Sequence, residues 1–160
     1  MLKLTKKADY GLIALKHLAS SGEASASAKD IADAYGIPPA LLSKILQKLA
    51  KGGFLRSEHG TNGGYKLARP ARDITALEVI RSIDGPIVLT ACFTEHGACS
   101  HTDKCNVREP LRKVHEGILR LLSGISIADM SQDDKAEACV DKTPARLYGL
   151  DTPAPAGGVN

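Results

Sequence analysis

The feature that most constrains the fold is a pair of short helical patterns joined by a tight turn that contains glycine. The first, SAKDIADAYGIP, predicts a helix capped by Ser27 or Ser25, with Ile31 and Ala34 inward and Gly36 at its end. The second, PPALLSKILQKLAKGG, has proline in its first turn and glycine at its end, the order that helix ends favour. Together the two patterns predict a helix-turn-helix.

The second helix is expected to have two different faces. Its large apolar residues form a wide stripe that predicts burial: Leu41, Leu42, Ile45, Leu46 and Leu49. At about 100° per residue, small, polar and basic side chains share the opposite arc: Ala40, Ser43, Lys44, Gln47 and Lys51. An exposed face of this composition on the second helix is typical of DNA recognition.

The charge of the chain is unevenly distributed. Residues 1–70 hold eleven Lys and Arg against five Asp and Glu, whereas residues 71–160 hold ten against thirteen. The basic half is therefore the more probable partner of nucleic acid, and Lys44, Lys48 and Lys51 are expected to contact phosphate. A merely solvated helix face is the alternative.

The residues around this unit predict a wing and two supporting helices. FLRSE and YKLAR flank the turn HGTNGG, which predicts a two-stranded β-hairpin whose Gly63 and Gly64 permit close backbone approach. A helix is expected from about Thr5 to Ser20, and Thr75 with Glu78 forms a capping box that opens another. The fold class that follows is mainly α: a winged helix-turn-helix with a two-stranded wing and a long dimerisation helix.

The long helix is predicted after residue 106. Its apolar residues repeat at four, three, four and three positions, and we call this row the seam: Val107, Leu111, Val114, Ile118 and Leu121. A heptad-like seam needs a partner helix, and the same helix of a second copy would supply it in a homodimer. Ser126 is expected to cap one further turn, and the acidic, Pro- and Gly-containing sequence beyond it reads as a flexible tail.

Three cysteines are concentrated in the segment that precedes this helix. Cys92, Cys99 and Cys105 lie within fourteen residues that also hold His96 and His101. The gaps of six and five residues are longer than those of C-x-x-C zinc hairpins, and thiolates at such spacing suit a cofactor larger than one ion. An iron–sulfur cluster, a Cys3His zinc site and free thiols all remain open, with a disulfide as a lesser alternative.

The sequence as a whole predicts four regions. Residues 1–84 would form the DNA-binding domain, 85–106 the cysteine segment, 107–130 the dimerisation helix with its short terminal helix, and 131–160 the tail. No apolar run approaches the roughly 20 residues of a membrane span, so a cytoplasmic protein that does not enter the membrane is expected. Cys139 in the tail is expected to be a free thiol.

Several of these motifs, in their order and spacing, resemble one known family over about residues 1–130. The chain resembles the winged-helix regulators that include the iron–sulfur cluster regulator IscR and the nitric-oxide sensor NsrR. The resemblance lies in KLTKKADYGLIAL, IPPALLSKILQKLAKGGFLRS, HGTNGGYKLARP and the three cysteines before a long helix. IDGPIVLTAC and CNVREPL look most like the branch that regulates the SUF cluster-assembly operon.

The resemblance implies a homodimer that binds double-stranded DNA at a palindromic promoter site. The positions that would face the major groove are Pro39, Ala40, Ser43 and Lys44, and those at the wing are His59, Gly60 and Asn62. IscR has glutamate at the position of Ser43, so its base preference is not expected here.

The resemblance also implies a [2Fe-2S] or [4Fe-4S] cluster on Cys92, Cys99 and Cys105. The histidine that IscR supplies three residues after its third cysteine is replaced by Arg108. In NsrR the fourth ligand is an aspartate on the first helix of the other subunit, and Asp9 matches it; His96 and His101 are local alternatives. A solvated acid favoured by the helix dipole is the competing interpretation of Asp9.

The expected function is therefore transcriptional regulation and not catalysis. A repressor that senses cluster status and controls iron–sulfur assembly genes is the leading hypothesis. A nitric-oxide or redox-sensing repressor of the same family is the first alternative. A cluster carrier that does not bind DNA is the second, and salt-dependent, sequence-selective DNA binding would separate it from the other two.

Overall fold

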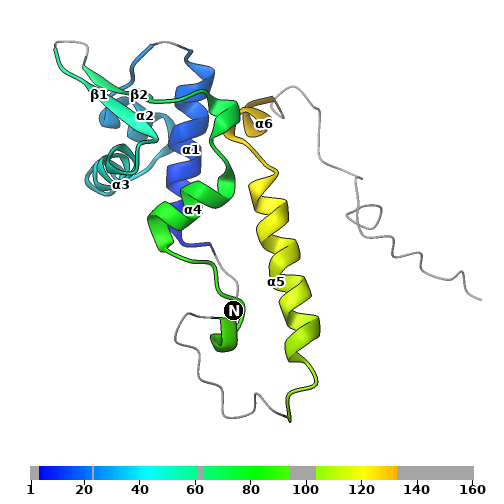
Figure 1. Cartoon of the computed structure of the whole chain (residues 1–160). Coiled ribbons are helices and arrows are strands. Elements are labelled where there is room, and N and C mark those ends of the chain that lie inside the picture. Colours follow the sequence, from blue (N-terminus) through cyan, green and yellow to red (C-terminus); the bar gives the residue numbers. More distant parts are fainter. Residues whose placement is uncertain (1–3, 23, 61–62, 94–103, 133–160) are drawn as a thin grey trace, which may run out of the picture.

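The computed structural model describes residues 4–22, 24–60, 63–93 and 104–132. These residues form a mainly helical structure with one two-stranded antiparallel sheet (Figure 1), as predicted. The elements, in order, are α1 Lys6–Ser20, α2 Ala28–Tyr35, α3 Pro39–Lys51, β1 Leu55–Glu58, β2 Gly64–Leu67, the 3₁₀ turn η1 Ala71–Asp73, α4 Ala76–Asp84, the 3₁₀ turn η2 Ala91–Phe93, α5 Arg108–Ser123 and α6 Ile127–Gln132. The predicted tail and Cys139 lie almost wholly outside the described residues.

The helix ends follow the capping signals of the sequence. Ser27 caps α2 in a reciprocal capping box with Asp30, and Gly36 ends that helix with a φ of 62°. The turn to α3 is thus only a few residues long, as a helix-turn-helix requires. One expectation was wrong: Ala34 is exposed, and Ala32 is buried beside Ile31 instead, because α2 meets the core through the side of the helix that holds these two consecutive residues.

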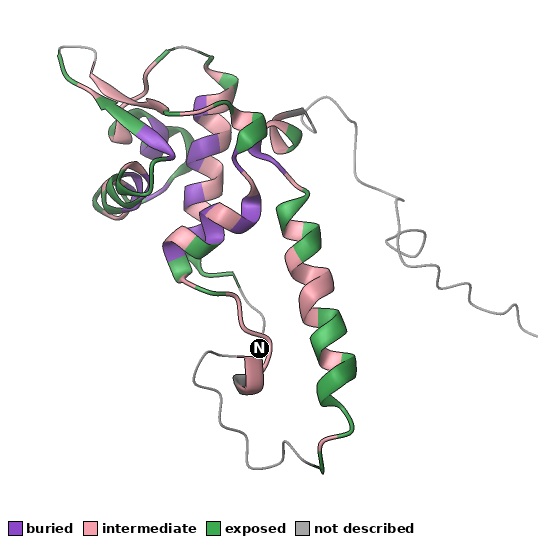
Figure 2. Ribbon diagram, viewed as in Figure 1, coloured by how far each residue is buried: buried purple, intermediate pink, exposed green. Residues whose placement is uncertain are grey.

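The core lies where α1, α3, α4 and α6 meet (Figure 2). Leu15 of α1, Leu46 of α3 and Ile127 of α6 are fully buried there. The chain is also joined to itself across this region, since Ala76 N donates to Ile125 O and Ile127 N donates to Ile74 O, both at 2.9 Å. The chain therefore returns after α5 to complete the core of the winged helix.

The wing is attached to the helix-turn-helix through its second strand. Leu55 pairs with Leu67 across the hairpin, and Tyr65 exchanges two backbone hydrogen bonds with Ala26, just before α2. A Cβ on Gly64 would lie 2.4 Å from the Ala26 carbonyl oxygen, and one on Gly63 would lie 2.5 Å from the carbonyl oxygen of Glu58. The close approach that these glycines permit is therefore to the protein's own backbone.

Helix α5 differs from the other helices. None of its 16 residues is buried (Figure 2), although its sequence is strongly amphipathic. Within the described ranges, no helix combines the length and the hydrophobicity that a membrane crossing requires.

Candidate nucleic-acid interface and cysteine segment

The outer face of α3 has the composition that the sequence predicts. Ala40, Lys44, Gln47 and Lys51 are exposed and Ser43 is half-buried, while the leucine and isoleucine stripe faces the core. Pro39 is also exposed at the start of the helix. With no acidic residue in the first turn, the exposed N-terminal end of α3 carries only the positive end of the helix dipole. This face suits a polyanion.

Lys48 is the exception among the three lysines of α3. Its Nζ donates a hydrogen bond of 2.8 Å to the carbonyl oxygen of Ile83, near the C-terminal end of α4. A lysine at a helix C-terminus satisfies a carbonyl that has no partner within the helix and favours the negative end of the dipole. Lys48 is thus held against α4, which leaves Lys44 and Lys51 as the better candidates for phosphate contact.

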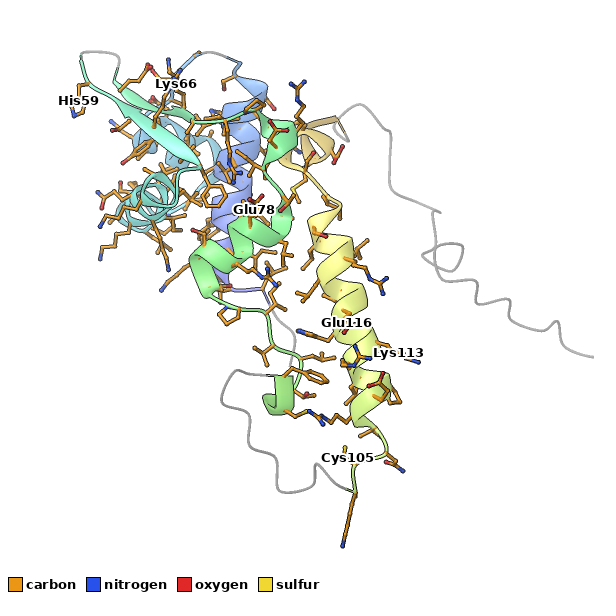
Figure 3. All side chains as sticks on the ribbon, in the orientation of Figure 1. His59, Lys66, Glu78, Cys105, Lys113 and Glu116 are labelled. Carbon is orange, nitrogen blue, oxygen red and sulfur yellow. The ribbon has the colours of Figure 1, made fainter. Side chains whose placement is uncertain are left out.

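The wing extends this surface and adds a basic residue that the sequence analysis missed. His59 lies exposed at the tip of the wing (Figure 3) and is followed by Gly60 with a φ of 127°, while Asn62 lies outside the described residues. Arg56 pairs directly with Lys66 in the hairpin register and is exposed. The alternation of FLRSE could have indicated it, because Leu55 is buried and its neighbour must then point outward.

The two cations of this cross-strand pair are in different environments. Lys66 forms an ion pair with Glu58 on the same hairpin. Like charges directly opposite each other destabilise a sheet, so the Glu58 carboxylate lowers the cost of placing Arg56 there. Arg56 therefore adds positive charge to the outer surface of the wing.

The cysteine segment begins at the junction of α1 and α4. The Thr5 hydroxyl, at the N-cap of α1, donates to the Asp84 carboxylate at 2.6 Å, immediately before Gly85. The chain then reaches η2, where Cys92 is half-buried and its Sγ lies 3.0 Å from the Thr90 hydroxyl oxygen. At this distance the two groups share a hydrogen bond that either the hydroxyl or the thiol can donate. The thiolate is the form of cysteine that binds metals.

Cys105 lies at the other end of the segment, before α5 (Figure 3). It is half-buried, and neither it nor Cys92 is in a disulfide. Cys99, His96 and His101 lie outside the described residues. Asp9 is exposed in the first turn of α1. Within the described part of the chain, no three Cys, His, Asp or Glu side chains converge on one point.

The cysteine segment packs on α5 through one aromatic contact. Phe93, the residue after Cys92, stacks on His115 of α5 with ring centroids 5.3 Å apart and an interplanar angle of 23°. The Nδ1 atom of His115 is buried and lacks a hydrogen-bond partner among the described residues. In the sequence His115 directly follows Val114 of the seam, a position at which a packing or surface histidine is the ordinary expectation.

These observations fit a thiolate-bound metal group. Two cysteines outside any disulfide bound the segment, and one of them lies within hydrogen-bond distance of a hydroxyl. A buried histidine nitrogen, in a ring stacked on the residue after Cys92, has no partner among the described residues. Thiolate and imidazole are the donors that iron–sulfur groups and zinc both accept. The 3₁₀ turn η2 and the start of α5 lie at the opposite end of the structure from the wing (Figure 1), so any effect of a group held there on DNA binding must pass through the fold.

Comparison with known proteins shows a match to a family of transcriptional regulators. The family model Rrf2, an iron-dependent transcriptional regulator, matches residues 4–133. The HTH-type transcriptional regulator NsrR of Geobacillus kaustophilus (strain HTA426) is 35% identical over 134 residues, which cover 82% of this chain and 91% of that protein.

Two solved structures show the same winged-helix fold. CymR (YrzC), the global cysteine regulator of B. subtilis, is similar with a TM-score of 0.73 and 27% identity, over 82% of this chain and 98% of that one. IscR of T. potens has a TM-score of 0.66 and 32% identity, over 88% of this chain and 94% of that one. These likenesses confirm the predicted fold class.

Proposed function

Because the chain belongs to the Rrf2 family of DNA-binding transcriptional regulators, which are not enzymes, we propose that it is a repressor that senses an iron–sulfur cluster. The cluster would be held by Cys92, Cys99 and Cys105, and the regulated genes would be those of SUF-type cluster assembly. The observation that carries the proposal is the pair of unbridged thiols, Cys92 and Cys105, in a segment joined to a winged helix.

DNA recognition rests on α3 and the wing. Lys44 and Lys51 would contact phosphate, and Ser43, Ala40, Gln47 and Pro39 would face base edges in the major groove. His59, Gly60 and Asn62 would bring the wing to the flanking backbone, with Arg56 as a further cation. Salt dependence follows, because each phosphate contact displaces condensed counterions.

A homodimer through α5 is the second part of the proposal. Three seam residues are exposed by about half, namely Val107 at 53%, Val114 at 52% and Leu121 at 44%. On the other side of the helix, Arg112 is hydrogen-bonded to both Glu109 and Glu116, and these bonds raise the pKa of its guanidinium. The polar face is thus satisfied within the helix, and the seam is the face that needs a partner.

The cofactor would report the state of the cell. When bound, an iron–sulfur group supplies a centre that oxygen, nitric oxide or iron shortage can remove. We propose Asp9 of the partner subunit as the fourth ligand, because it is an exposed carboxylate in the first turn of α1 and matches the ligand position that the resemblance to NsrR implies. Oxygen ligands suit sulfur-rich iron less well than thiolate does, so this position would be the labile one.

The proposal is tested by anaerobic purification, an absorption spectrum, and iron and sulfide analysis. Alanine at Cys92, Cys99 or Cys105 should abolish the visible absorption, whereas Cys139→Ala should leave it unchanged. Operator binding should then differ between the cluster-bound and cluster-free protein. Full iron and sulfide after loss of one of the three cysteines would remove that residue from the ligand set.

The likeness to NsrR favours a nitric-oxide sensor as the alternative. To separate the two sensors, the cluster-bound protein is exposed to nitric oxide or to oxygen and its DNA affinity is then measured. The treatment that changes the affinity at the lower dose identifies the signal. A colourless protein without iron that still binds operator DNA would instead favour a cysteine regulator similar to CymR. Equal binding to scrambled DNA would favour a cluster carrier.

A further inference from the structure

Two histidines of the described residues pack against an aromatic ring, His17 edge-on and His115 stacked, and His115 has a buried nitrogen without a hydrogen-bond partner. His17 of α1 contacts Tyr35 with centroids 5.6 Å apart, and its Nδ1 lies 3.3 Å from the Tyr35 hydroxyl. His115 of α5 contacts Phe93 at 5.3 Å, and its buried Nδ1 has no partner within the described chain. A buried polar atom without a partner is destabilising and uncommon in folded proteins, so the His115 nitrogen calls for an explanation.

The surroundings of His115 indicate what kind of atom it would meet. Its ring lies against the residue that follows Cys92, and the Cys92 sulfur already has the Thr90 hydroxyl at 3.0 Å. Phe93 covers one face of the imidazole, which leaves the ring edge to make polar contacts. The residue adjoining Phe93 in the sequence is Cys92, which brings a sulfur to this part of the chain.

A direct metal–nitrogen bond fits less well than a hydrogen bond. At 1.5 Å per residue, His115 lies about 10 Å along α5 from Arg108, and Cys105 precedes that residue. Within the described residues, Cys92, Cys105 and His115 do not converge as a set of three ligands would. A hydrogen bond to sulfur on the Cys92 side needs no such convergence.

We infer that His115 donates a hydrogen bond from Nδ1 to a sulfur atom of the iron–sulfur group bound at Cys92. The inference rests on the proposed function, since it assigns a role to His115 only when that group is bound. Hydrogen bonds to the sulfurs stabilise the more negative, reduced state and so raise the reduction potential of a cluster. His115 would therefore be a positioning and tuning residue that keeps the cluster reducible and slows its oxidative loss.

The test compares two matched substitutions in the full-length, anaerobically purified protein. His115→Phe keeps a ring against Phe93 but removes the nitrogen, and His17→Phe keeps a ring against Tyr35 far from the cysteine segment. His115→Asn is the rescue variant, because its side-chain amide reaches approximately the position of Nδ1. The measurements are the reduction potential of the cluster, the decay of its visible absorption in air, and the thermal unfolding of the cluster-free protein.

His115→Phe should lower the reduction potential of the cluster and speed the decay of its absorption several-fold. The cluster-free variant should be at least as stable to thermal unfolding as cluster-free wild type. His115→Asn should recover part of both changes, and His17→Phe should change neither. An unaltered potential and decay in His115→Phe would overturn the inference. So would a strong magnetic coupling between the reduced cluster and ¹⁵N-labelled His115, which would indicate direct ligation. Wild-type protein that binds no iron would instead refute the proposed function.

Discussion

Helices α1 and α5 are almost equal in length, with 15 and 16 residues, but their surroundings are opposite. Five residues of α1 are buried, among them Ala8, Leu15 and Leu18, because α3, α4 and α6 pack around it. No residue of α5 is buried, although its seam is as regular as any apolar pattern in the chain. An amphipathic pattern specifies which face of a helix is buried, but the number of neighbouring elements decides how completely.

The difference also separates two kinds of stability. The contacts of α1 all form within one chain, so the winged helix can be stable at any concentration. The seam of α5 has fewer such contacts. Ile118 and Leu121 line a mainly apolar cavity of about 510 Å³ between α5, the end of α4 and residues 85–88, and much of the seam stays exposed. Burial of this region by a second copy would make its stability depend on concentration.

The largest expected effect comes from matched leucines of the two helices. Leu15→Ala in α1 removes a fully buried side chain and should lower the free energy of unfolding by about 2–5 kcal/mol at every protein concentration. Leu121→Ala in α5 should cost less, and its cost should vary with protein concentration because it weakens association. Urea unfolding at two concentrations a hundredfold apart checks both, and a concentration-independent loss in Leu121→Ala would contradict the comparison.

The next effect concerns the seam itself. Val114→Glu places a charge in the proposed interface and should give monomers whose operator affinity is lower by roughly a hundredfold, because paired modules gain that much from linkage. Lys113→Glu changes a neighbouring exposed residue outside the seam and should remain dimeric. Sedimentation separates the outcomes, and a Val114→Glu protein of unchanged size would show that the seam is not the interface.

A smaller effect is expected on the α3 surface. Lys44→Ala and Lys51→Ala should weaken binding to all DNA sequences and each reduce the slope of log affinity against log salt by about 1. Lys48→Ala is the matched control: it loses the hydrogen bond to Ile83 and should lower stability while leaving the salt slope near wild type. Fluorescence anisotropy over a salt series measures the DNA affinity of all three variants. Equal slopes for the three would contradict the assignment of phosphate contact to Lys44 and Lys51 but not to Lys48.

The winged helix could be predicted from the sequence because each local signal agrees with the packing. Ser27, Gly36 and Thr75 mark helix ends that the structure confirms, and the glycine-rich turn HGTNGG locates the two strands of the wing on either side of it. Contacts between distant residues left no such signal. The hydrogen bond from Lys48 to Ile83 joins residues 35 apart, and the stack of Phe93 on His115 depends on how the cysteine segment returns along α5.

The candidate cofactor site could be predicted only in part for the same reason. Cysteine spacing indicates the residue types that would hold a metal, but ligation depends on which side chains converge in space. The buried nitrogen of His115 shows the limit most clearly, because a histidine beside an apolar seam looks like an ordinary packing residue until its neighbours are known. Asp9 matches a family position, but a match in sequence carries no information on the distance between its carboxylate and the thiols.

The smallest effect is expected from pH and again divides the two regions. Asp30, Glu78 and Asp129 each close the first turn of a helix in the winged-helix core, at α2, α4 and α6. Hydrogen bonds from Ser27, from the Thr75 backbone and from Ser126, respectively, are the main causes that lower the pKa of these carboxyls.

Because each pKa is lower in the folded than in the unfolded state, these groups stabilise the fold fully above the unfolded value of roughly 4. That contribution is lost as pH falls from this value through the folded pKa. The variant Asp30→Asn/Glu78→Gln/Asp129→Asn should therefore be less stable near pH 7 and should lose less further stability on acidification than wild type. Asp33→Asn, an exposed acid of α2 outside the capping box, is the control. Urea midpoints from pH 7 to pH 3 measure the difference, and parallel curves for wild type and the triple variant would show that the caps do not cause the acid sensitivity of the core.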